Sequence, residues 1–156
     1  MSVQVIIYSS DRIRGGILKE ILRRNKIGTL LLDKIMDVKS SISSHQPAIV
    51  IFDTTSSLKN EINFLKNLSS SIDDHFTIFV GDPLIINTLH DFHQNNIQKQ
   101  DNPKIEGNLH NKIFLSDPLD PDVIISKSLD ILYGYPENHE ERQLLETDLR
   151  QYLKLD

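Results

Sequence analysis

The sequence contains no cysteine, which excludes disulfides, thiolate zinc sites and cysteine nucleophiles. It also contains no apolar run near the roughly 20 residues that a membrane-spanning helix needs. The start lacks a basic stretch followed by a long apolar run, so no signal peptide is predicted and a cytoplasmic location is expected. Positive charge is scarce, with 17 Lys and Arg against 22 Asp and Glu, a net charge of -5. We therefore expect neither nucleic acid nor an anionic membrane as a partner.

Common catalytic and nucleotide-binding signatures are absent too, including HExxH, GxSxG, GxGxxG and the P-loop. His90 and His93 have the i, i+3 spacing of two metal ligands, but no third ligand is evident and a solvated helix face is the favoured interpretation. One basic cluster stands out, and it too is interpreted as a solvated helix face. Its members are Arg12, Arg14, Lys19, Arg23, Arg24 and Lys26.

What is present is an alternation of strand and helix patterns over a chain of 156 residues, a length that fits one domain. Strands are expected at residues 3–8, 29–33, 48–52, 76–80 and 112–115. Helices are expected at residues 13–24, 36–44, around 62–68, at 84–92 and at 120–134. In the first helix Ile17, Leu18, Ile21 and Leu22 form the expected apolar face, and Gly28 ends it. This alternation predicts an α/β fold, a doubly wound parallel sheet with helices on both faces.

Polar residues follow the strands where each one ends. In "IVIFDTTSS", residues 49–57, Asp53 directly ends the most apolar strand. Because sites in open parallel sheets form at the carboxyl ends of strands, Asp53 is a candidate site residue. Asp and Ser are also common in turns and helix caps, and for Asp53 both interpretations stay open.

The order and spacing of these segments resemble the receiver domain of response regulators over about residues 3–134. "VIIYSSDRIRGGILKEIL" is similar to the family's first strand, acidic turn and first helix. "QPAIVIFD" resembles the run that ends at the phosphate-accepting aspartate, which would be Asp53. "KIFLSDPLDPDVIISKSLDIL" is similar to the last strand, the lysine–proline turn and the last helix. The resemblance implies a five-stranded, flavodoxin-like sheet of order 2-1-3-4-5 and a cis bond between Asp117 and Pro118.

The chain departs from this family at nearly every other chemical position. Ser9 and Ser10, with Asp11 one step later, stand where the family has its Mg²⁺-binding acids. Gly81 or Val80 replaces its Ser or Thr. Asp117 replaces its lysine, which reverses the charge at this position; one charge contact is worth roughly 4 kcal/mol at about 4 Å and an effective dielectric near 20. We therefore expect a degenerate receiver in which Asp53 has lost its counter-charges and does not form an aspartyl phosphate.

The resulting hypothesis is a non-enzymatic signalling module, without a cofactor, that binds protein partners, such as a sensor kinase or another signalling protein. One alternative is a phosphorylatable response regulator with an atypical Mg²⁺ site. Another is a small-molecule domain that binds phosphate at a rim of hydroxyl groups. That rim comprises Ser9, Ser10, Thr54, Thr55, Ser56 and Ser116.

Two segments have no counterpart in the resemblance. Residues 94–111 form a polar insertion before the last strand, predicted to be a frayed helix end and a loop. Residues 135–156 follow the receiver-like domain, residues 1–134, as a helical extension with leucines at 145, 149 and 153. This stripe is expected to pack on its own domain, with a homodimer as the open alternative.

Overall fold

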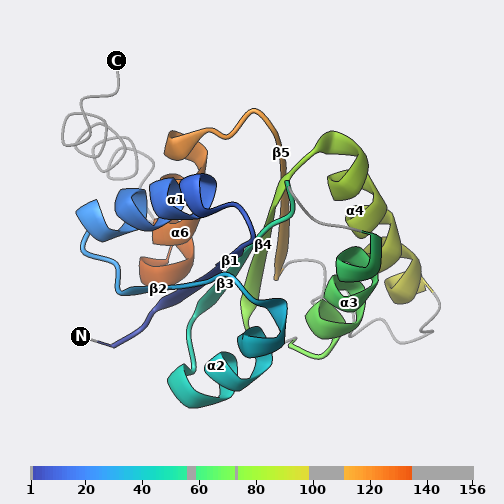
Figure 1. Cartoon of the computed structure of the whole chain (residues 1–156), viewed down its shortest axis with the longest axis horizontal. Helices are drawn as coiled ribbons and strands as arrows, with labels where there is room; N and C mark the ends of the chain where they lie inside the picture. Colours follow the sequence, from blue (N-terminus) through green and yellow to red (C-terminus); the bar gives the residue numbers. More distant parts are fainter. Residues whose placement is uncertain (1, 56–58, 73, 99–110, 135–156) are drawn as a thin grey trace.

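The computed structural model describes residues 2–55, 59–72, 74–98 and 111–134 as one layered α/β unit (Figure 1). Its five strands are β1 (Val5–Ser9), β2 (Thr29–Leu32), β3 (Ile49–Asp53), β4 (Phe76–Gly81) and β5 (Lys112–Ser116). Its helices are α1 (Arg12–Arg24), the 3-10 turn η1 (Ile35–Asp37), α2 (Val38–His45), α3 (Lys59–Ser70), α4 (Pro83–Gln98) and α6 (Pro121–Tyr133).

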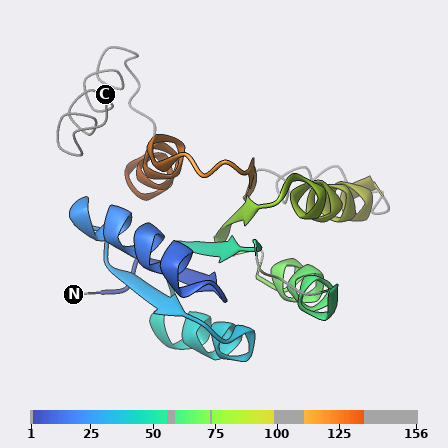
Figure 2. The same ribbon diagram turned by 45° about the horizontal axis from the view of Figure 1, so that its top comes forward.

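The sheet is parallel throughout and has the order β2-β1-β3-β4-β5, which confirms the predicted architecture. β1, β3 and most of β4 are buried, because helices cover both faces of the sheet. α1 and α6 lie on one face, and α2, α3 and α4 lie on the other (Figures 1 and 2). Among the described residues no helix is long and apolar enough to cross a membrane.

Each face of the sheet has its own hydrophobic core. On the α1 and α6 side, Leu18 and Ile124 pack against alternate strand residues such as Ile7. On the other side, Phe52 and Phe79 stack with ring centroids 5.5 Å apart. Full burial of side chains of this size stabilises the fold by about 1.5–3 kcal/mol each, so the two cores fix the helices and the loops that they carry.

The structure corrects the expected first helix in two respects. Ile17 is 46% exposed, and the buried positions of α1 are Gly15, Leu18 and Leu22. The helix is thus rotated about its axis relative to the expected apolar face. The helix ends at Arg24 as expected, but its C-cap is Asn25 and not Gly28.

The fourth helix begins one residue before its predicted start and continues into the predicted frayed helix end. It was expected over residues 84–92, and α4 runs from Pro83 to Gln98. The first part of the predicted 94–111 insertion is therefore helical, and buried His93 in the preceding turn anchors this extension to the core. Residues 99–110 of the insertion and the predicted C-terminal helix at 135–156 lie outside the described residues.

Candidate functional site

Parallel pairing brings the ends of β1 and β3 together at the carboxyl edge of the sheet. Ser9 is the register partner of Asp53, and Asp53 in turn pairs with Val80 of β4. Asp53 is only 1% exposed although it is the last residue of its strand. A carboxylate buried to this degree needs hydrogen-bond donors, so its partners determine what it can do.

Two hydroxyl groups donate to the Asp53 carboxylate, one to each oxygen. Ser9 Oγ lies 2.7 Å from Oδ2, and Thr55 Oγ1 lies 2.8 Å from Oδ1. The backbone N–H of Thr55 also donates to Oδ1 over 3.3 Å. The short distances are typical of bonds to an ionised acceptor.

The counter-charge of Asp53 is Arg14, which reaches the carboxylate from the first turn of α1. Its Nε lies 3.2 Å from both Oδ1 and Oδ2 of Asp53. Its Nη2 donates to Asp117 Oδ1, 2.9 Å away in the loop after β5. One guanidinium therefore joins two carboxylates from different loops, and we call Arg14, Asp53 and Asp117 the arginine bridge.

Interactions with the two aspartates keep the Arg14 guanidinium charged. Burial of Arg14, whose side chain is 20% exposed, lowers the pKa of the guanidinium. Hydrogen bonds and attraction from Asp117 and Asp53 outweigh this effect, so the pKa is raised above its ordinary value. Arg14 is consequently a permanent cation at this edge of the sheet.

The start of α1 explains why Arg14 reaches the site. Asp11 is the N-cap, and its carboxylate accepts from the N–H groups of Ile13 and Arg14 over 3.0 and 3.2 Å. The next residue, Gly15, lies so close to the sheet that a Cβ would stand 2.9 Å from Leu31 Cδ1. This close approach of the first turn places the Arg14 side chain at the end of β3.

The proposed degenerate pocket comes together only in part. Asp117 lies at the site through Arg14, and Ser9 contacts Asp53 directly. The Asp11 side chain caps the start of α1, and Ser10 is exposed beside the site. The capping interpretation, which the sequence favours for these polar residues other than Asp53, is confirmed for Asp11.

Gly81 is the remaining residue of the proposed pocket, and its surroundings leave no room for a side chain. Its φ of +149° is rarely adopted by other residues, and an added Cβ would collide with Thr54 Oγ1. Thr54 is fixed there because both its N–H and its hydroxyl donate to the carbonyl of Val80, over 2.8 and 3.0 Å. A hydroxyl side chain at position 81 is therefore excluded while Thr54 keeps this conformation.

Two expectations from the sequence are wrong at this site. Arg14 was assigned to a solvated helix face, and Asp53 was expected to lack a counter-charge; the structure pairs the two residues. A signal for Arg14 was available, because counting back in steps of four from the buried Leu22 and Leu18 leads to position 14. The expected rim of hydroxyl groups is also reduced, since the hydroxyls of Ser9 and Thr54 bond to protein acceptors.

The histidine pair is not a solvated helix face as a whole. His93 is 5% exposed, and its Nε2 lies 2.9 Å from Ser69 Oγ of α3. Burial and the positive charge of Lys112 lower the pKa of His93 to about 4. Within residues 2–55, 59–72, 74–98 and 111–134, no group of three or more His, Cys, Asp or Glu side chains could hold a metal ion.

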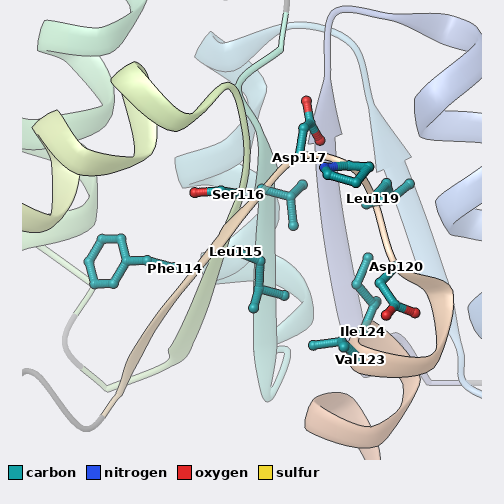
Figure 3. A pocket seen from close by; sticks show the side chains of 10 residues that line it. Phe114, Leu115, Ser116, Asp117, Leu119, Asp120, Val123 and Ile124 are labelled. Carbon is teal, nitrogen blue, oxygen red and sulfur yellow. The ribbon is translucent and has the colours of Figure 1, made fainter.

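The loop after β5 carries Asp117 and borders a small hollow of about 160 Å³. Figure 3 shows Leu115 and Leu119 beside Ile124 of α6, with Asp117 above them at the carboxyl edge. The bond between Asp117 and Pro118 is cis, as the resemblance implied. This loop thus places Asp117 Oδ1 2.9 Å from Arg14 Nη2.

Comparison with solved structures gives this arrangement a fold family. The chain is similar to the signal receiver domain of a response regulator from Bermanella marisrubri, with a TM-score of 0.57 and 13% identity over 85% of this chain and 99% of that one. The chain has the fold of a response-regulator receiver domain. No family model matches the sequence. A comparison with curated proteins finds no match either.

Two further receiver structures share the fold. The N-terminal domain of the nisin resistance regulator NsrR matches with a TM-score of 0.54 and 16% identity, over 85% of this chain and 99% of that one. The pseudo-receiver domain of CikA matches with a TM-score of 0.52 and 13% identity, over 88% of this chain and 100% of that one. At these identities the similarity establishes the receiver fold alone.

Proposed function

We propose that this protein is a non-enzymatic, receiver-like signalling module that acts through protein partners and does not use phosphorylation of Asp53 as its switch. The observation that carries the proposal is the arginine bridge, in which Arg14 pairs with Asp53 and Asp117. The receiver fold and its similarity to a pseudo-receiver domain support a role in signalling.

Phosphoryl transfer to Asp53 would require a free carboxylate oxygen and a cation on the transferred group. Both oxygens already accept hydrogen bonds from a hydroxyl and from Arg14 Nε. A Mg²⁺ ion would have to displace the guanidinium or lie beside its positive charge. Separating a buried ion pair costs about 3–5 kcal/mol, which opposes metal entry.

The charges of the arginine bridge also oppose the alternative of phosphate binding. Two carboxylates share one guanidinium, so the three side chains together carry a negative charge. A phosphate group would meet this charge, and Arg14 has its Nε and Nη2 donors engaged. Protein–protein interaction therefore accounts best for a receiver fold with this site, with a sensor kinase or another signalling protein as the partner.

Intact-mass spectrometry after incubation with acetyl phosphate and Mg²⁺ tests the proposal. We expect no mass gain of one phosphoryl group under conditions that modify a phosphorylatable receiver in a parallel reaction. The control is Asp53→Asn, which removes the candidate acceptor. A stoichiometric gain in the natural chain that is absent from Asp53→Asn would overturn the proposal and favour the phosphorylatable alternative.

A further inference from the structure

The attachment of α4 to the rest of the fold depends on a residue that can gain a charge. α4 lies against α3, β4 and β5 at one side of the molecule (Figure 1). Over residues 83–95 its buried side chains are Ile86, Leu89 and His93, which their i, i+3, i+7 spacing places on one face of the helix. The two apolar residues hold the first half of α4, and the histidine holds the second half.

The surroundings of the His93 ring are largely apolar. The ring centroids of Phe79 in β4 and Phe114 in β5 lie 5.8 and 6.1 Å from that of His93. Phe92 of the same helix meets the ring edge-on at 5.2 Å. The Ser69 hydroxyl of α3 lies 2.9 Å from Nε2. A charge on this ring would therefore be poorly solvated.

The charged and titratable side chains around His93 are mostly basic. β5 contributes buried Lys112, whose ammonium donates to a carbonyl of α3 over 3.0 Å. α3 contributes Lys66, whose ammonium lies 5.5 Å from the centroid of an aromatic ring of α4. α4 itself contributes His90, which lies 3.7 Å from the exposed carboxylate of Asp91, and β4 has no titratable side chain. Among the described residues, the buried basic side chains are those of His93 and Lys112.

Protonation of His93 would place a second buried positive charge beside Lys112. The Ser69 hydroxyl donates to the carbonyl of Leu65 over 2.6 Å, so Nε2 carries the proton of the neutral ring and acid adds a proton at Nδ1. Burial and the charge of Lys112 lower the pKa of His93 to about 4. A ring that has left the core regains an ordinary pKa of about 6.5. Acid therefore favours a conformation in which His93 is exposed.

Another buried polar group beneath α4 favours local opening over global unfolding. Thr77 of β4 pairs in register with Lys112, and its buried hydroxyl has no hydrogen-bond partner among the described residues. Opening of α4 lets water reach this hydroxyl, which lowers the cost of the opened state. The core on the opposite face of the sheet is formed by aliphatic residues such as Leu18 and Ile124, which do not titrate.

We propose that protonation of His93 in mild acid releases the C-terminal half of α4 from α3 and β5 while the rest of the described fold stays assembled. The release uncovers Phe79 and Phe114, whose rings stack with centroids 5.3 Å apart. With a pKa of about 4 in the packed helix and about 6.5 in the released one, the opening constant rises about 30-fold from pH 7.5 to pH 5.

Backbone amide hydrogen exchange, followed by NMR in the full chain at pH 7.5 and pH 5 with and without low urea, tests the proposal. A released half-helix is too short to keep its hydrogen bonds in water, so its amides exchange. After division by the intrinsic rates, the opening constants of Phe92 and Gln94 should rise about 30-fold at pH 5. They should hardly change with urea, because local opening exposes little surface. The amides of Leu18 and Leu22 should open less often and respond steeply to urea, as global unfolding does.

Two variants on the same helix identify the titrating group. His93→Gln should abolish the rise in opening at pH 5. The matched control, His90→Gln, removes a histidine whose side chain is 41% exposed and should keep most of the rise. A rise that persists in His93→Gln would overturn the proposal.

The natural chain provides a test that does not require either variant to fold. Equal opening constants and equal urea dependence for the amides of α4 and α1 at pH 5 would show that acid unfolds the whole domain, which contradicts a local release. None of these outcomes bears on phosphorylation of Asp53, so the proposed function stands or falls separately.

Discussion

Arg14 supplies the positive charge that the acidic residues of the site require. A buried aspartate without a cation would be costly, and a second aspartate nearby would add to that cost. With Arg14 between them, Asp53 and Asp117 are each within 3.2 Å of the same guanidinium. An arginine from α1 thus supplies the positive charge that both carboxylates contact.

Arg14→Gln should reveal how strongly the fold depends on this compensation. Removing the cation leaves the Asp53 carboxylate buried beside Asp117, so we expect a loss of about 3–5 kcal/mol in the free energy of unfolding at pH 7. Urea denaturation at pH 7 measures this loss.

Arg24→Gln is the matched control, since Arg24 is 60% exposed and pairs with exposed Glu20 along one helix. Its loss should cost less than about 1 kcal/mol. Equal losses of unfolding free energy from the two substitutions would mean that the arginine bridge contributes no more than a surface pair.

At the scale of elements, a buried polar cluster connects α3, α4 and β5. The Ser69 hydroxyl lies 2.6 Å from the carbonyl of Leu65 and 2.9 Å from His93 Nε2. With its one proton donated to Leu65, the hydroxyl must accept from a protonated Nε2, so His93 is a neutral donor here. Lys112 Nζ donates to the carbonyl of Ser69 over 3.0 Å and ties β5 to the same helix.

This cluster predicts a loss of stability in mild acid. The pKa of His93 is about 4 in the folded chain and 6.5 for an unperturbed histidine, so between these values the unfolded chain binds more protons. The contribution of neutral His93 is present in full above pH 6.5 and is lost as the pH falls toward 4.

His93→Gln isolates this contribution, because glutamine can donate to Ser69 but does not titrate. The variant should be less stable at pH 7.5, and the difference in unfolding free energy should narrow between pH 6.5 and 4. Denaturation curves across this range provide the measurement. A difference that stays constant with pH would show that His93 does not remain neutral in the fold.

The elements themselves could be predicted from the sequence because each has a local cause. Apolar runs of five or six residues marked the central strands, and Pro121 with Gly134 marked the limits of α6. The rotation of α1 could not be predicted. Ile17 fits the apolar spacing of the helix, and this spacing does not tell whether the isoleucine is buried or exposed. The burial of His93 in α4 could not be predicted either, because it is a tertiary contact that a local pattern does not contain.

At the scale of the whole molecule, the receiver fold assembles the site from distant parts of the chain. Arg14 and Asp117 are 103 positions apart, and Arg14 and Asp53 are 39 apart. The sequence predicted that the strand ends meet at one edge, which brought Asp53 and Asp117 into the same region. It did not predict the arginine between them, because that contact depends on how α1 is turned against the sheet.

The most direct test of the account is the NMR signal of the Arg14 side-chain Nε–H in isotope-labelled protein. If the arginine bridge holds in solution, this proton exchanges slowly with water at neutral pH, and Asp53→Asn shifts the signal and speeds the exchange. Exchange as fast as that of exposed Arg24, unchanged by Asp53→Asn, would contradict the claim that the Arg14 guanidinium is hydrogen-bonded to the Asp53 carboxylate.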